Sequence, residues 1–332
     1  MSPETYPSQR PMEIIEDALG EASDGDRSPH VTSIPWIDPH QHTQTVSWDD
    51  LHNFDLTGCQ AVVMIAQNPQ WSPYRPVEPS DVRFLWDLAI KWIDLLDAKH
   101  HFDSYTAIGI HTLARVDDWE ELLQILPEYL SLAEVVAVGE TGIDPVQYGT
   151  HWPVADQRDL VRQQMSIAGK AGLPIIIHTP SKKSGAGAES EGWGGVGLTA
   201  PDPEIDYSQP KLECTEIDIE LMDQAGIDDD QVVIDHGAPS IIDLVMEQTN
   251  CYLSFSVSNP RKGVTSSDIA EAIHTYGPDR FLIDSDVIGY RHSDMFCVPE
   301  TILDLHEHGV SIEDIRTVVY DNPRDVLGID IE

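Results

Sequence analysis

Short apolar runs rich in β-branched residues alternate with longer amphipathic segments along most of the chain, beginning at Ile34. Apolar runs of about four to eight residues are typical of strands, whereas apolar positions three and four residues apart indicate helices. The pattern predicts strands over residues 34–38, 61–66, 105–111, 135–140, 174–178, 232–236, 251–257 and 280–286. Helices are predicted over residues 81–99, 118–132, 156–172, 215–225, 240–249, 267–276 and 299–308, with a last helix over 311–320.

Several of these strands are apolar without alternation, as in 135–138 and 175–177. Strands with this pattern are covered on both faces, which favours a parallel sheet. Eight strand–helix alternations within the length of one domain predict the α/β class and a single (β/α)8 TIM barrel. An open doubly wound sheet is the alternative, but it rarely needs eight parallel strands without a switch-point motif after the first strand.

The composition divides the chain into three parts. Residues 1–33 are rich in Pro, Ser, Asp and Glu and are predicted to be a flexible acidic extension ahead of a barrel domain over 34–332. Segment 181–213 interrupts the barrel pattern with many glycines and is interpreted as a long insertion or lid. Residues 192–197 match GxGxxG, but no strand precedes the match and no clear helix follows it, so a dinucleotide site is not predicted.

Metal-competent side chains follow most of the predicted strands. The carboxyl ends of barrel strands converge on one rim, so residues distant in the sequence become neighbours there. His40 and His42 lie two residues apart on an extended chain and can present two imidazoles to one ion. A lone histidine is more often structural, but ligand types after strands one, four, five, six and eight together predict a metal site. Its predicted ligands are His40, His42, Glu140, His178, His236 and Asp286.

Three further polar residues lie near the same strand ends. His111 ends the third predicted strand, where it could bond a substrate oxygen or orient a neighbouring side chain. Asp284 has the strand parity of Asp286 but lies one layer deeper, which favours support of a ligand over ligation. Asp235 has the opposite parity to His236 and is interpreted as structural.

The order of these motifs resembles the TatD family of the amidohydrolase superfamily. The shared pattern is His-x-His, then Gly-Glu-x-Gly-x-Asp from Gly139, two single histidines, and an acidic-x-Asp on the last strand. The chain is most similar to an archaeal branch of TIM-barrel hydrolases, on the runs 176–180, 233–236 and 283–286. The resemblance covers about residues 34–328.

The resemblance implies two divalent ions bridged by the strand-four glutamate. Asp286 would bind one ion, and it could also accept the proton of the attacking water or be a ligand with no proton role. Four imidazoles and two carboxylates suit Zn, Mn, Co or Ni, and Mg less well, so the identity of the metal stays open. The implied ligand sets are His40, His42, Glu140 and Asp286 for one ion, and Glu140, His178 and His236 for the other.

The chain departs from the family pattern around the substrate. Many members have a cysteine after the fifth- and sixth-strand histidines, where this chain has Thr179 and Gly237, and its nearest candidate for the usual substrate-binding cation is Lys182. The family most often implies hydrolysis of phosphodiester bonds at nucleic-acid ends, as by a deoxyribonuclease or exonuclease. The alternative is a small-molecule hydrolase of an ester, lactone or amide. An inactive metal-binding scaffold is disfavoured because all six ligand positions are filled.

The net charge of the chain indicates the salt concentration at which the protein works. The chain has 58 acidic and 19 basic residues, a net charge of −39 and a pI near 4.3. Such a charge repels itself at low salt, whereas multimolar salt screens it within a few Å. The composition is therefore typical of a halophile. The chain has no stripe of Lys and Arg that could neutralise phosphates, which argues against a general nucleic-acid-coating role.

The remaining composition predicts a cytoplasmic protein with no membrane segment and no evident stable protein partner. No stretch approaches the roughly 20 apolar residues of a membrane helix, and residues 1–10 lack the apolar core of a secretory signal. Four widely separated cysteines are interpreted as reduced thiols: Cys59, Cys214, Cys251 and Cys297.

We expect the thermal midpoint of unfolding to climb steeply with KCl concentration, because added ions screen the repulsion among the acidic side chains. Differential scanning fluorimetry from low to multimolar KCl measures this dependence. A midpoint that stays flat across that range contradicts the halophilic interpretation.

Overall fold

Eight parallel strands form one sheet in chain order in this computed structural model, which describes residues 30–66, 76–113, 115–144, 152–180, 205, 209–258, 263–288 and 294–331. Each strand pairs with the next in parallel register. The strands are β1 (Trp36–Gln41), β2 (Cys59–Ile65), β3 (Asp103–Ile108), β4 (Val135–Thr141), β5 (Ile175–Ile177), β6 (Val232–Ile234), β7 (Tyr252–Ser256) and β8 (Phe281–Asp284). All eight predicted strands are present, displaced by about three residues at most.

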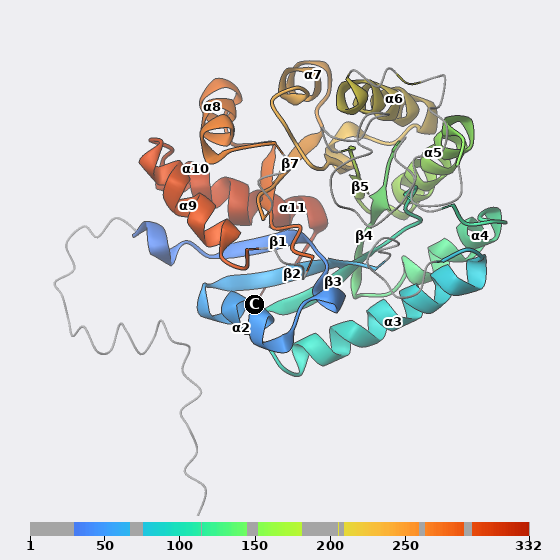
Figure 1. Ribbon diagram of the computed structural model, residues 1–332, viewed down its shortest axis with the longest axis horizontal. Helices are drawn as coiled ribbons and strands as arrows, with labels where there is room; N and C mark the ends of the chain where they lie inside the picture. Colours follow the sequence, from blue (N-terminus) through green and yellow to red (C-terminus); the bar gives the residue numbers. More distant parts are fainter. Residues whose placement is uncertain are drawn as a thin grey trace, which may run out of the picture. The chain divides into compact units, whose positions relative to one another are not determined.

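The first and last strands meet where the sheet curves round on itself. The Asp286 N–H donates to the His40 carbonyl (3.0 Å), and the His42 N–H donates to the Val287 carbonyl (3.2 Å). These bonds make a nearly closed barrel with helices around its outside (Figure 1). The predicted TIM-type barrel is confirmed.

The helices connect successive strands and cover the outer face of the sheet (Figure 1). The α-helices are α2 (Trp48–Leu56), α3 (Pro79–Asp97), α4 (Glu120–Tyr129), α5 (Val154–Ala171), α6 (Pro210–Ala225), α7 (Ile242–Gln248), α8 (Ser266–Tyr276), α9 (Cys297–Glu307), α10 (Ile312–Arg316) and α11 (Asn322–Leu327). Short helical turns are η1 (Val31–Ser33), η2 (Thr43–Thr45), η3 (Asp229–Gln231) and the π-helical turn η5 (Thr317–Asp321).

Three helices differ from the sequence predictions, one of them α6, which begins five residues before the predicted helix 215–225. The sequence analysis missed α2, because its Trp, Asp, Asn and His residues have modest helix propensity. One local and one tertiary feature compensate: the Ser47 hydroxyl accepts the Asp50 N–H at the N-cap (3.1 Å), and Leu51 and Phe54 are buried. The last predicted helix, 311–320, continues further as α10, η5 and α11. Pro323 follows the π-helical turn η5 within this continuous helical segment.

Apolar side chains on both faces of the strands explain the lack of alternation in the sequence. Ala61, Val63 and Ile65 of β2 belong to the cluster inside the barrel, whereas Val62 and Met64 belong to the larger cluster beneath the helices. The interior is therefore a packed core. Buried histidines and carboxylates gather at the carboxyl ends of the strands.

Two predicted segments fall largely outside the described residues. Of the extension 1–33 only residues 30–33 are described, and of the insertion 181–213 only residue 205 and residues 209–213. Lys182 also lies outside the described residues. Helix α6 begins at Pro210, inside the predicted end of the insertion.

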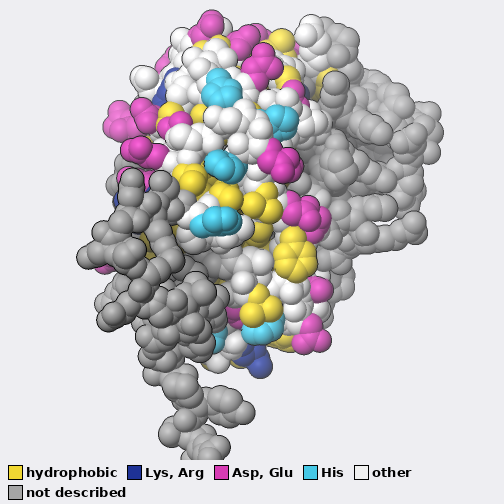
Figure 2. All heavy atoms as spheres, turned by 90° about the vertical axis from the view of Figure 1, so that its left-hand side faces the viewer, with side chains coloured by type: hydrophobic (Ala, Val, Ile, Leu, Met, Phe, Trp, Pro, Cys, Tyr) yellow, Lys and Arg dark blue, Asp and Glu magenta, His cyan; other side chains and the backbone are white. Residues whose placement is uncertain are grey.

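The acidic composition is visible on the molecular surface. On the face that Figure 2 shows, acidic side chains are scattered among histidines, with few Lys or Arg side chains between them. Within the described ranges, no helix has the length and apolar character needed to cross a bilayer.

The buried amide of Gln164 connects α5 to the ends of β3 and β4. Its Oε1 accepts the Ile110 N–H (2.7 Å), and its Nε2 donates to the Ile110 carbonyl (3.1 Å) and to Thr141 Oγ1 (2.7 Å). We expect Gln164→Leu to lower the free energy of unfolding by roughly 2–4 kcal/mol, because it leaves buried polar groups unpaired.

Urea unfolding at constant KCl measures that loss. Gln163→Leu is the matched control, because Gln163 is only partly buried and bonds Asp159 at the surface. Equal unfolding midpoints for the two variants would show that the Gln164 contacts contribute little.

Candidate metal centre

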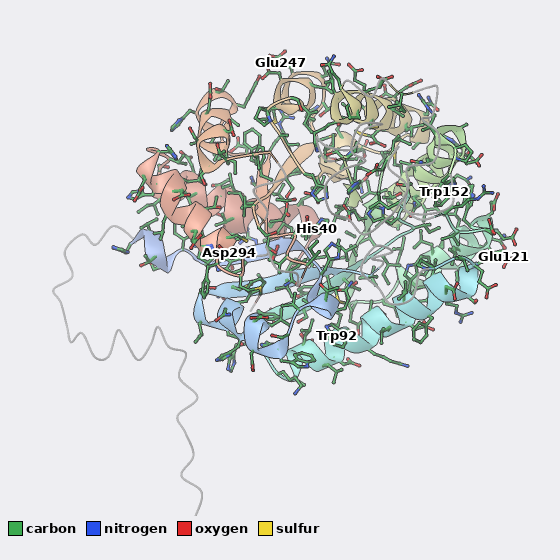
Figure 3. The ribbon with its side chains drawn as sticks, in the orientation of Figure 1. His40, Trp92, Glu121, Trp152, Glu247 and Asp294 are labelled. Atoms are coloured by element: carbon green, nitrogen blue, oxygen red, sulfur yellow. The ribbon has the colours of Figure 1, made fainter. Side chains whose placement is uncertain are left out.

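The predicted ligands lie together at the carboxyl ends of their strands. Figure 3 labels His40, which projects inside the ring of helices. The backbone carries each side chain there at the end of a strand or within two residues of it. All are at least nine-tenths buried: His40, His42, Glu140, His178, His236 and Asp286.

One group of three side chains forms around His42. Its Nε2 lies 3.3 Å from His40 Nε2 and 3.3 Å from Asp286 Oδ1, and His40 Nε2 lies 3.7 Å from the same oxygen. Zinc bonds to nitrogen and oxygen of about 2.0–2.1 Å in a tetrahedron separate neighbouring ligand atoms by about 3.3 Å. The observed separations therefore match the edges of a coordination polyhedron, and these donors fit a divalent ion.

The Glu140 carboxylate is the centre of a second group. Its Oε1 lies 2.6 Å from His178 Nδ1 and 3.1 Å from His236 Nε2. Its Oε2 lies 3.3 Å from His111 Nε2 and 3.7 Å from His40 Nε2. One carboxylate thus faces imidazoles from both groups, which is the position that a bridging ligand requires.

These contacts shift the protonation of the buried groups. Burial alone would raise the pKa of Glu140, but His40, His178 and His111 hold it well below its usual range. Burial would lower the pKa of His178, yet Glu140 and Asp144 raise it to about 9. Without a metal, protons on the His40 and His178 imidazoles offset part of the carboxylate charge. A bound cation would take over that role and release protons.

Asp235 is the main residue that the sequence analysis misjudged. Its Oδ2 lies against His40 Nδ1 in a close ion-pair contact, and its Oδ1 accepts the His236 N–H (2.6 Å). A proton held on Nδ1 leaves the Nε2 lone pair of His40 free for a metal. Asp235 therefore orients a predicted ligand, in addition to its structural place beside β6.

The parity argument failed at Asp235 because the chain leaves the regular strand before it. Strand β6 ends at Ile234, and His236 has a left-handed backbone with φ of 58°. Asp286, two residues past β8, has φ of 43°. Such conformations are costly for residues other than glycine and cluster at functional sites. These left-handed conformations interrupt the side-chain alternation of a strand. The Asp235 and His236 side chains therefore both face the candidate metal centre.

Asp284 lies deeper than Asp286 and has a different partner from the ligands. Ser254 Oγ donates a short hydrogen bond to its Oδ2. Burial and the nearby Asp235 raise its pKa well above its usual range. A neutral carboxyl at this depth is consistent with a supporting role.

His111 is a hydrogen-bond donor. Its Nδ1 accepts the Leu113 N–H (3.3 Å), which places the ring proton on Nε2, facing Glu140. Burial lowers the pKa of His111, so the ring is neutral. The sequence analysis also left Asp144 out of the site, although it ends the Gly-Glu-x-Gly-x-Asp motif. Its Oδ2 lies 2.9 Å from His178 Nε2.

The family departure at Thr179 has a structural explanation. Lys211, on α6, is buried and donates to Thr179 Oγ1 (2.7 Å) and to the His236 carbonyl (2.7 Å). Thr179 in turn donates to the Asp235 carbonyl (2.6 Å). Thr179 therefore braces the ends of β5 and β6. Lys211 was missed because it precedes the helix predicted over 215–225.

The second departure, Gly237, reflects the packing of Phe255. A Cβ at position 237 would lie 2.8 Å from the Phe255 ring. The cysteine of other family members does not fit here unless that ring moves.

Comparisons with known proteins agree with this geometry. The model of the family described as TatD related DNase matches residues 37–328. An uncharacterized metal-dependent hydrolase of Methanocaldococcus jannaschii is 28% identical over 288 residues, which are 87% of this chain and 98% of that protein.

Two crystal structures share the fold. A TatD-like protein from Archaeoglobus fulgidus has a TM-score of 0.62 and 22% identity, over 89% of this chain and 100% of that chain. An enamidase described as a new member of the amidohydrolase superfamily has a TM-score of 0.59 and 13% identity, over 95% of this chain and 73% of that one.

We expect Asp235→Asn to weaken divalent-metal binding about 10–100-fold, because it removes the carboxylate that fixes the tautomer of His40. Titration against a chelating dye measures the affinity. Asp284→Asn is the matched control, because an amide resembles the neutral carboxyl at that position. Equal losses of metal affinity in Asp235→Asn and Asp284→Asn would mean that Asp235 does not support metal binding through His40.

Proposed function

The chain belongs to the TatD related DNase family of the amidohydrolase superfamily, and from this we propose that it is a metal-dependent hydrolase of phosphodiester bonds at nucleic-acid ends. The observation that carries the proposal is the buried Glu140 carboxylate between two groups of imidazoles. It supports a paired-metal centre, which suits the in-line displacement of a phosphoryl group because both reacting oxygens can be held.

The proposed ligand sets combine the two groups of donors. Bound divalent ions (Zn, Mn, Co, Ni or Mg) would supply Lewis acidity that lowers the pKa of a water and neutralises charge on the substrate oxygens. One ion would be held by His40, His42, Glu140 and Asp286, and the other by Glu140, His178 and His236.

The remaining proposed roles belong to side chains facing the same space. Asp286 Oδ1 accepts the proton of the attacking water, since its carboxylate lies at the edge of the first donor group. The Nε2–H of His111, which faces Glu140, would be the contact to a substrate oxygen. Lys182 remains a proposed substrate contact, on the strength of its position shortly after His178.

A small-molecule hydrolase is the second candidate, and the surface charge favours it. A net charge of −39 repels a polyanion unless salt screens the two. An uncharged ester, lactone or amide meets no such barrier. In a halophile, high salt would screen much of this repulsion between the acidic protein and nucleic acid.

The deciding experiment presents both substrate classes to the metal-loaded protein at multimolar KCl. The panel contains 3′-labelled single-stranded DNA and RNA, lactones and aryl esters. We expect mononucleotides to be released, and the rate to fall about 100-fold or more in Asp286→Asn, which lacks the proton acceptor. Asp223→Asn, an exposed position on α6, is the matched control.

The results of the substrate panel and of metal analysis distinguish the candidate functions. Turnover of esters or lactones with nucleic acid untouched would establish the small-molecule alternative. Two bound ions with no turnover of either class would contradict the phosphodiesterase proposal. Glu140→Ala should lose metal from both positions, and full metal content in that variant would exclude the bridged pair.

A further inference from the structure

A second cluster of metal-competent side chains lies at the opposite end of the barrel. It consists of His52 and Asp55, three residues apart on α2, and His100, in the connection that leads into β3. The carboxyl-terminal turn of α2 precedes β2, and His100 precedes β3, so the cluster lies near the amino-terminal ends of both strands. The candidate metal centre occupies the carboxyl ends, which makes the two clusters distinct.

Three ligand atoms converge in this cluster. Asp55 Oδ2 lies 3.2 Å from His52 Nδ1 and 3.0 Å from His100 Nδ1, and all three atoms lie within 4.8 Å of one another. Bonds to zinc of about 2.0–2.1 Å separate adjacent ligand atoms by about 3.3 Å in a tetrahedron. The two measured separations are close to that edge length.

The surroundings hold two of the ligands in place. The Asp55 and His100 side chains are only 3% and 4% exposed. The other Asp55 oxygen, Oδ1, accepts the His101 N–H at 2.7 Å, which orients the carboxylate. The His100 ring stacks on Phe102 at 4.9 Å and on Trp48 at 5.8 Å between centroids.

The third ligand leaves the site open to solvent. The His52 side chain is 60% exposed, so an ion can enter beside it and water can complete the coordination. Burial would raise the pKa of Asp55, but the His101 N–H and the two imidazoles lower it, so the carboxylate is charged. Two imidazoles and one carboxylate suit Zn²⁺, Co²⁺, Ni²⁺ and Cu²⁺.

We propose that His52, Asp55 and His100 form a second, peripheral site for a divalent transition-metal ion, which links α2 to the start of β3. Residues at the amino-terminal face of a TIM barrel serve stability, whereas the chemistry takes place at the other face. An ion bound only by the folded chain stabilises it. The peripheral site therefore stabilises the barrel and takes no part in hydrolysis.

The test uses the full-length chain and two separate readouts. Trp48 stacks against His100 and against Trp92, the latter labelled on α3 in Figure 3, so an ion at this site lies close to an indole pair. After treatment with a chelator, the protein is titrated with Co²⁺ or Cu²⁺ while tryptophan fluorescence is followed. Bound zinc is counted by elemental analysis after gel filtration.

Wild-type protein should bind one more zinc ion per chain than His52→Gln, and the variant should lose both the fluorescence quenching and the zinc-dependent rise in Tm. His274→Gln, an exposed histidine in the last turn of α8, is the matched control and should behave as wild type. Hydrolytic activity should be the same in all three. Equal zinc content and quenching in His52→Gln and wild type would overturn the proposal, whatever metal the candidate centre binds.

Discussion

The buried carboxylate of Glu140 is the interaction on which the candidate centre depends. Three imidazoles contact it directly, and a fourth, His40, approaches it while also meeting His42 and Asp286. A charged carboxylate at this depth is tolerable only because cationic groups surround it. In the protein without metal those groups are the His40 and His178 rings, whose pKa values are raised, and in the metal-bound protein they would be divalent ions. The same arrangement therefore explains the shifted pKa values and the suitability for metal.

The barrel makes this concentration of charge possible. Parallel strands bring six distant residues to one rim, and the apolar core beneath them fixes the strand ends. Local backbone detail then directs the side chains. The left-handed conformations of His236 and Asp286 aim them inward, and Lys211 and Thr179 brace the ends of β5 and β6.

The two ends of the barrel have different physical characters. At the carboxyl ends, five carboxylates and five imidazoles are buried: Glu140, Asp144, Asp235, Asp284, Asp286, His40, His42, His111, His178 and His236. At the amino-terminal ends, the His52–Asp55–His100 cluster is smaller and reaches solvent through His52. This contrast agrees with reactive chemistry at one end and stabilisation at the other. The acidic outer surface bears on the choice of substrate more than on metal binding.

The sequence by itself determined the strands, the barrel and the ligand types at the strand ends, because hydrophobic period and residue order are local properties of the chain. It predicted that His40 and His42 would share a face, and the structure places their Nε2 atoms 3.3 Å apart. Short α2 escaped prediction because its stability comes from a cap and from burial. Only the tertiary structure decided that Asp235 contacts His40 and that Thr179 lies beneath the site. Those contacts join residues far apart in the chain and depend on φ angles that deviate from strand alternation, which no local pattern encodes.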